Sequence, residues 1–137
     1  MIFQTLTTSF KEQMLKGEHD LLTDTLKLAL YYSTADLDED TLIYTATGEV
    51  VGGGYSAGGE ILTGVTINTQ EGTAYVNFND AVWNPASFTA AGGLIYNASK
   101  ANKSIAVLSF GNDKTATNSF TVQMPANTST SALLRFN

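Results

Sequence analysis

The chain contains 137 residues, of which 43% are hydrophobic and only 15% charged, with a net charge of −6 and no cysteine. This length suits one domain with a sizeable core, and the hydrophobic content argues against a disordered chain. Without cysteine, disulfides and thiolate-bound metals are excluded. No apolar run approaches the roughly 20 residues of a membrane-spanning helix, so no membrane partner is expected.

The charges divide the chain into two unequal parts. Residues 1–60 hold ten acids and three bases, whereas residues 61–137 hold three acids and four bases. A phosphate-binding surface needs clustered Lys and Arg, which the sequence lacks, so nucleic acid is not expected as a partner. The N-terminus has neither the basic region nor the long apolar stretch of a signal peptide, and we expect synthesis in a cytoplasm without export.

Residues 1–17 predict a short helical segment or arm. Ser9 and Glu12 have the spacing of a capping box, and Gly17 suits the left-handed stop of a helix, so we place the helix at roughly residues 5–16. A helix of about two turns is marginal alone and must dock, either on its own sheet or on a neighbouring subunit. Its apolar face is the candidate partner-binding surface and comprises Phe3, Leu6, Phe10 and Met14.

Residues 25–137 predict a β-rich body. Alternating leucines between residues 26 and 32 predict a half-buried strand. An acidic loop at residues 36–40 follows, and then a segment at 41–45 that suits either a helical turn or a short strand. The next connection, at 48–59, is dense in glycine and has no regular pattern.

Turn residues at regular intervals predict further strands downstream. The clearest pair is a hairpin of residues 61–69 and 74–78 around the turn at Glu71 and Gly72. Further strands are expected at about residues 81–90, 93–98, 104–110, 119–124 and 131–136. The turns between them are placed at Gly92-Gly93, Ala101-Asn102, Asn112-Asp113 and residues 125–127. We therefore predict a mainly β chain that folds as one antiparallel β-sandwich or barrel with a short N-terminal helix, over residues 1–137.

Two segments partly match ligand-binding motifs. Asp36, Asp38 and Asp40 have the opening spacing of a calcium loop, but Thr41 and Thr47 stand where the motif needs Gly and Glu, so we expect a solvated loop. Residues 52–57 match the dinucleotide fingerprint G-x-G-x-x-A, yet a β-pattern follows where the fingerprint needs a helix. We expect flexible turn glycines there, and neither a metal nor a cofactor.

The catalytic candidates are few. His19, the only histidine, lies in a charged loop after the predicted helix, and no Ser occupies a nucleophile elbow. Paired carboxylates for sugar hydrolysis would have to come from predicted turns, at Glu71, Asp80 and Asp113. A sugar-stacking face is a further alternative, although core packing explains the same aromatic residues, which are Tyr75, Phe78, Trp83, Phe88 and Tyr96. We expect no enzyme and no catalytic residue.

One set of residues is spread over essentially the whole chain: 9–11, 24–31, 48–50, 54–59, 62–66, 94–97 and 105–111, together with Leu15, Gly17 and Trp83. In this set the chain resembles a family of small virion structural proteins of tailed phages, notably of cyanophages. None of these is a chemical motif, and it is the set that is specific. The resemblance implies a non-enzymatic part of a virion that is made in the host cytoplasm.

Within such a virion we expect a capsid decoration, or cement, protein on the capsid surface. Its partner would be the major capsid protein or another virion subunit, and the chain itself would form a homo-oligomer, expected to be a trimer. One alternative is a head–tail, tail or fibre-adaptor component. Another is a carbohydrate-binding module for adsorption to the host.

Overall fold

The computed structural model describes residues 1–136, and this part of the chain contains ten strands and one helix. The elements are β1 (Thr5–Leu6), α1 (Thr8–Leu15), β2 (Leu26–Tyr31), β3 (Glu60–Ile61), β4 (Thr66–Gln70), β5 (Thr73–Asn77), β6 (Ala81–Trp83), β7 (Thr89–Asn97), β8 (Lys103–Thr115), β9 (Phe120–Val122) and β10 (Leu134–Phe136). The mainly β architecture with antiparallel strands and one short helix confirms the predicted fold class.

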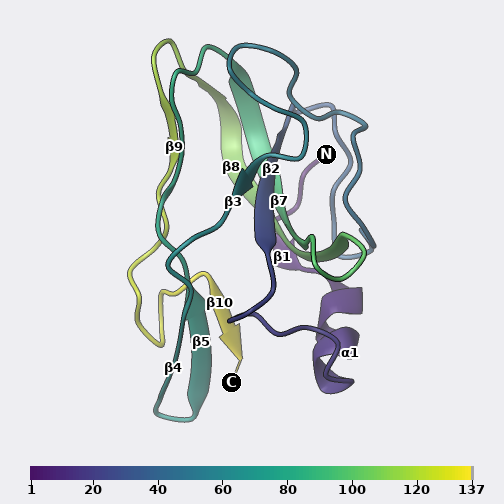
Figure 1. Ribbon diagram of the computed structural model, residues 1–137, viewed down its shortest axis with the longest axis vertical. Coiled ribbons are helices and arrows are strands. Elements are labelled where there is room, and N and C mark those ends of the chain that lie inside the picture. Colours follow the sequence, from purple (N-terminus) through teal and green to yellow (C-terminus); the bar gives the residue numbers. More distant parts are fainter. Residues whose placement is uncertain (137) are drawn as a thin grey trace.

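Three sheets build the sandwich. The large sheet has the strand order β1-β8-β7-β2-β3, and the two small sheets have the orders β10-β5-β4 and β6-β9. In Figure 1, β4, β5 and β9 lie to the left of the large sheet, and α1 lies at the lower right. The small sheets therefore cover one face of the large sheet.

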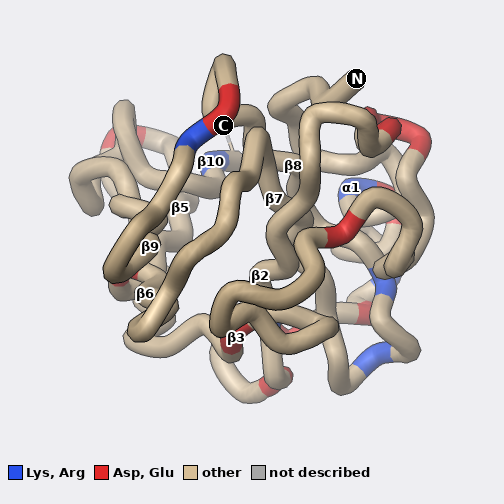
Figure 2. The backbone as a smooth tube through the Cα atoms, turned by 90° about the horizontal axis from the view of Figure 1, so that it is seen from above, with Lys and Arg blue, Asp and Glu red and all other residues tan. Residues whose placement is uncertain are grey.

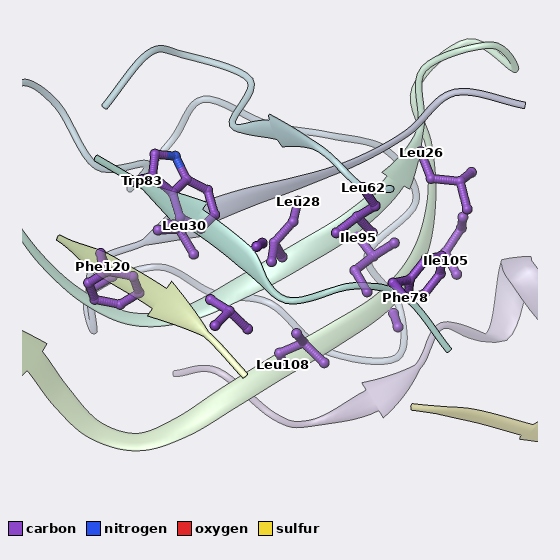
Figure 3. Close-up of a cluster of buried hydrophobic side chains, with 14 of the residues drawn as sticks. Leu26, Leu28, Leu30, Leu62, Phe78, Trp83, Ile95, Ile105, Leu108 and Phe120 are labelled. Carbon is purple, nitrogen blue, oxygen red and sulfur yellow. The ribbon is translucent and has the colours of Figure 1, made fainter. Parts of the chain in front are cut away.

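The main core lies between these layers (Figure 3). Leu28 and Leu30 of β2 belong to the same buried cluster as Ile95 of β7, Trp83 of β6 and Phe120 of β9. The rings of Trp83 and Phe120 meet edge-on with centroids 6.1 Å apart, an arrangement that aromatic pairs favour. Each large apolar side chain buried here contributes about 1.5–3 kcal/mol to folding.

The expectation of a half-buried strand at residues 26–32 is wrong, because both faces of β2 are buried. Ala29 and Tyr31 point away from the main core into a second cluster with Leu94 of β7 and Val107 of β8. Leu37, from the irregular segment after β2, covers this second cluster. The alternating pattern predicted the strand correctly. It could not predict that the segment around Leu37 would bury the second face of this strand.

Two of the predicted turns lie inside long strands. Gly92 and Gly93 belong to β7, where a Cβ on Gly93 would lie 2.8 Å from Leu28 Cδ1 and 2.9 Å from the carbonyl oxygen of Ala29. These glycines allow close strand approach and do not form a turn. Residues 112–113 belong to β8: between the pairs Ala90–Lys114 and Gly92–Ser109, β7 advances by two residues and β8 by five, which makes a bulge.

The predicted hairpin is present, whereas two predicted long strands are divided. Gln70 pairs with Thr73, and both turn residues, Glu71 and Gly72, have positive φ, as a two-residue hairpin turn requires. The strand expected at 61–69 instead contributes β3 to the large sheet and β4 to a small one. The strand expected at 81–90 likewise divides into β6 and the start of β7.

The helix begins later than predicted and has a different N-cap. Thr7, not Ser9, caps α1, and its Oγ1 accepts a hydrogen bond of 3.3 Å from the backbone N–H of Phe10. The stop at Gly17 is confirmed: its φ is +71°, and the N–H groups of Gly17 and Glu18 donate to the carbonyls of Met14 and Gln13. This pair of bonds is a Schellman motif.

Residues 48–59, which we call the glycine loop, run alongside β2, and Gly59 packs tightly against its middle. A Cβ on Gly59 would overlap the carbonyl oxygen of Leu28, and Gly59 also has a φ of +81°. Gly52 has a similar φ of +77° but open space around it. Gly52 is therefore needed only for its positive φ, whereas Gly59 is needed both for its positive φ and for the close approach to β2.

We expect Gly59→Ala to destabilise the protein much more than Gly52→Ala. Both variants incur the strain of positive φ, about 1–2 kcal/mol, but Gly59→Ala adds an overpacking penalty of about 1–3 kcal/mol. Urea denaturation followed by tryptophan fluorescence measures the difference. Equal losses of unfolding free energy would contradict the tight packing of the glycine loop.

Candidate functional site

His19 is buried, and both of its ring nitrogens are used within the chain. Its Nε2 lies 2.7 Å from Gln13 Oε1, and its Nδ1 lies 2.9 Å from Asn97 Nδ2. Because the amide nitrogen of Asn97 donates, Nδ1 accepts, and a neutral ring then carries its proton on Nε2 and donates to Gln13. This arrangement joins α1 to β7 and leaves no ring nitrogen for a nucleophile.

An ion-pair network surrounds this histidine. Asp24 accepts hydrogen bonds of 2.8 Å from both Asn97 Nδ2 and Lys100 Nζ. Burial alone would raise the pKa of Asp24, but the hydrogen bonds from Lys100 and Asn97 lower it to about 2. Lys103 Nζ lies 2.7 Å from Glu18 Oε1. Together these contacts tie the loop after α1 to the turn between β7 and β8.

The three aspartates of the acidic loop do not converge on a cation. Asp36 Oδ1 lies 2.6 Å from the N-terminal ammonium of Met1, and Asp38 Oδ1 accepts from the backbone N–H of Asp40 at 2.9 Å. Within residues 1–136, no group of three or more His, Asp or Glu side chains is placed to hold a metal. The carboxylates of Asp36 and Asp38 therefore bind the N-terminal ammonium and the backbone of the loop itself.

The glycine loop leads to β3 and surrounds a buried carboxylate that the sequence did not reveal. Glu49 accepts hydrogen bonds of 2.5 Å from the hydroxyls of Tyr44 and Tyr55, and one of 2.8 Å from the N–H of Gly58. Burial and then the bond to Glu49 raise the pKa of both tyrosines. The hydroxyl of Tyr55 also accepts from the N–H of Leu30, so this cluster fixes the glycine loop to β2.

The structure does not assemble the sugar-binding candidates: the aromatic residues are buried, and the carboxylates lie in separate segments. The five aromatic residues proposed for a stacking face are all buried: Tyr75, Phe78, Trp83, Phe88 and Tyr96. Glu71, Asp80 and Asp113 are exposed, but they lie in the β4–β5 turn, before β6 and on β8. Asp80 also accepts a hydrogen bond from the N–H of Met124. These residues do not form a sugar-binding cleft.

The apolar face expected on the N-terminal segment is split between the core and the surface. Phe10 is 0% exposed, and its ring lies 5.2 Å from that of His19 and 6.1 Å from that of Phe136. Leu6 and Met14 are partly buried against the main core. Phe3 alone is largely exposed, at 54%. Of the two docking alternatives, the helix therefore packs on its own sandwich.

Phe3 borders a shallow hollow that is the candidate partner-binding site. The hollow has a volume of about 540 Å³ and is lined by Phe3, Gln4, Thr5, Thr8, Lys11 and Glu39. We call it the Phe3 groove. An exposed aromatic ring beside one basic and one acidic side chain suits a protein partner, since aromatic residues are enriched at interface cores and charges at their rims. The groove brings together no residues for catalysis.

Comparison of the chain with protein-family models, with curated proteins and with solved structures finds no match. Within the described residues, no helix has both the length and the apolar character needed to cross a membrane.

We expect Phe10→Ala to destabilise the protein far more than Phe3→Ala. Phe10→Ala removes a fully buried ring and should lower the unfolding free energy by about 3–5 kcal/mol. Phe3→Ala changes a largely exposed ring and should lower it by less than about 1 kcal/mol. Thermal and urea unfolding of both variants measures this, and equal stability losses would contradict the packing described for α1.

The fold should lose stability as the pH falls below about 6.5. Burial and then the charge of Lys103 lower the pKa of His19 below its usual 6.5, against the opposing effect of Asp24. The unfolded chain therefore binds a proton at a higher pH than the folded one, so protonation favours unfolding. Urea midpoints should be constant above pH 7 and fall between pH 6.5 and 5. In His19→Gln this slope should flatten, and an unchanged slope would assign it to other groups.

Proposed function

We propose that the chain is a non-enzymatic structural subunit of a tailed-phage virion, where it binds the major capsid protein on the shell as a decoration, or cement, protein. The resemblance noted for the sequence, over essentially its whole length, supports the virion context. One structural observation carries the assembly role. His19, Asp24 and Glu49 are committed to internal hydrogen bonds, whereas Phe3 is left exposed beside a hollow.

Attachment through the Phe3 groove would depend on modest affinity at many equivalent positions. Burying the remaining exposed half of one Phe ring contributes on the order of 1 kcal/mol. A symmetric shell repeats such a contact many times, so weak individual contacts still stabilise the whole. The low proportion of charged residues, 15%, keeps the desolvation penalty of such contacts small.

A carbohydrate-binding adsorption module is the second candidate, and one groove favours it. Between the end of β8 and β9 lies an open groove of about 560 Å³. Its lining includes the half-buried ring of Phe110 with the hydroxyl and amide side chains of Thr115, Thr121 and Gln123, whereas Phe120, which also lines it, is buried in the main core. Rings with neighbouring hydroxyls and amides have the chemistry for sugars. A head–tail, tail or fibre-adaptor role would use the same body at a different place in the virion.

Binding to capsids assembled without this chain tests the proposal. Wild-type protein should bind, and Phe3→Ala should bind roughly fivefold more weakly, as expected for about 1 kcal/mol. Leu15→Ala is the matched control, because Leu15 is an exposed apolar residue at the other end of α1 and should bind like wild type.

The number of copies in the purified virion distinguishes the alternatives. A decoration role expects hundreds of copies, whereas six or twelve copies would replace it with a tail or neck ring. Binding to immobilised host polysaccharide without binding to capsids would favour the carbohydrate module instead.

A further inference from the structure

β4 lies at the edge of its sheet, and it is exposed and uncharged along its whole length. It pairs only with β5 among the described residues, and all five of its residues are exposed. Figure 1 shows the β4–β5 hairpin projecting at the lower left, on the far side of the molecule from α1. The strand contains no charged residue and no proline, which are the usual means of blocking an edge.

The register shows which backbone groups face outward. Gln70 and Thr73 flank the two-residue turn and so form a hydrogen-bonded pair, and the pair of Asn68 with Tyr75 is of the same kind. The alternation of an antiparallel ladder then turns the N–H and C=O groups of Ile67 and Thr69 away from β5. These groups are available to another strand.

We propose that β4 is the edge through which two copies of this chain associate, pairing antiparallel across a two-fold axis at Asn68. Ile67 then lies opposite Thr69 of the partner subunit, and Thr69 lies opposite Ile67 of the partner subunit. The outward-facing groups meet in two hydrogen-bonded pairs, each of which exchanges two N–H···O bonds. Asn68 faces Asn68 of the partner subunit in the closer, non-hydrogen-bonded pair, where the two side-chain amides bind each other.

Charge favours a second copy as the occupant. β4 lies in residues 61–137, which carry three acids and four bases, whereas residues 1–60 carry ten acids and three bases. Figure 2 shows that charged residues are sparse along the whole backbone. Two copies that meet at β4 therefore approach through their nearly neutral parts, and no like charges stand opposite each other in the paired strands.

The small size of the contact limits its strength, and its two-fold symmetry limits the assembly to a dimer. A stable interface buries about 1,200–2,000 Å², which a five-residue edge does not reach, so association should be weak in dilute solution. A self-complementary contact closes as a dimer, in place of the trimer expected from the sequence. The role of this weak contact in the virion rests on the proposed function. Neighbouring copies on a shell have a high effective concentration, which would allow a weak contact to form there. The test below uses purified chain without particles, so its failure leaves the capsid-binding experiment unaffected.

Sedimentation of the purified chain from micromolar to millimolar concentration should show a monomer–dimer equilibrium. Hydrogen exchange at the amides of Ile67 and Thr69 should slow as the concentration rises, while exchange at Asn68, already bonded to β5, should not change. Asn68→Lys should associate about fivefold more weakly, because two lysines then stand directly opposite. Asn68→Asp should behave in the same way, and an equimolar mixture of the two variants should restore dimers.

Thr121→Lys is the matched control, because it places the same charge at an exposed position of another edge strand, β9. It should associate like wild type. The proposal is overturned if the chain stays monomeric at millimolar concentration, forms a trimer, or loses association in Thr121→Lys. It is also overturned if the two Asn68 variants, mixed, fail to pair. The exchange measurement on the wild type decides the matter even where a variant fails to fold.

Discussion

Apolar side chains project from both faces of the large sheet, and each face must be covered. On one face, Leu28 and Leu30 meet the two small sheets, and on the other, Tyr31 and Val107 need a second cover. The segment that covers this second face, after β2, has no regular secondary structure. Its buried backbone N–H and C=O groups must therefore find hydrogen-bond partners outside a sheet. The path of residues 32–59 and the position of the N-terminus both follow from this requirement.

Glu49 shows how irregular chain meets that requirement. A buried carboxylate is costly unless its oxygens are hydrogen-bonded, and here two tyrosine hydroxyls and the N–H of Gly58 supply the bonds. The same tyrosine, Tyr55, accepts from β2, so the carboxylate connects the glycine loop to the sheet. Ionisable groups used in this way hold the fold together. Glu49 and His19 are both buried, and the polar atoms of both are bonded within the chain.

Local patterns predicted what depends on local chemistry, and long-range packing decided the rest. The β4–β5 hairpin was predictable because its two-residue turn needs positive φ, which Gly72 supplies. The helix stop at Gly17 was predictable for the same reason. Gly93 resembled a turn residue because nothing near it in sequence shows that Leu28 approaches its Cα. His19 was placed correctly after the helix, but its partner Asn97 is 78 residues away, so the network was not foreseeable.

The strand edges bear on the proposed association through β4. In the large sheet, both outer strands, β1 and β3, are only two residues long, and the chain continues from β1 directly into α1. Such short edges are a common protection against unwanted pairing. β4 is longer, uncharged and exposed on both faces, yet it belongs to a hairpin with a well-defined turn. Of the strands that end a sheet in the described part of the chain, β4 is the longest, at five residues, so it offers another strand more backbone groups than any other end strand does.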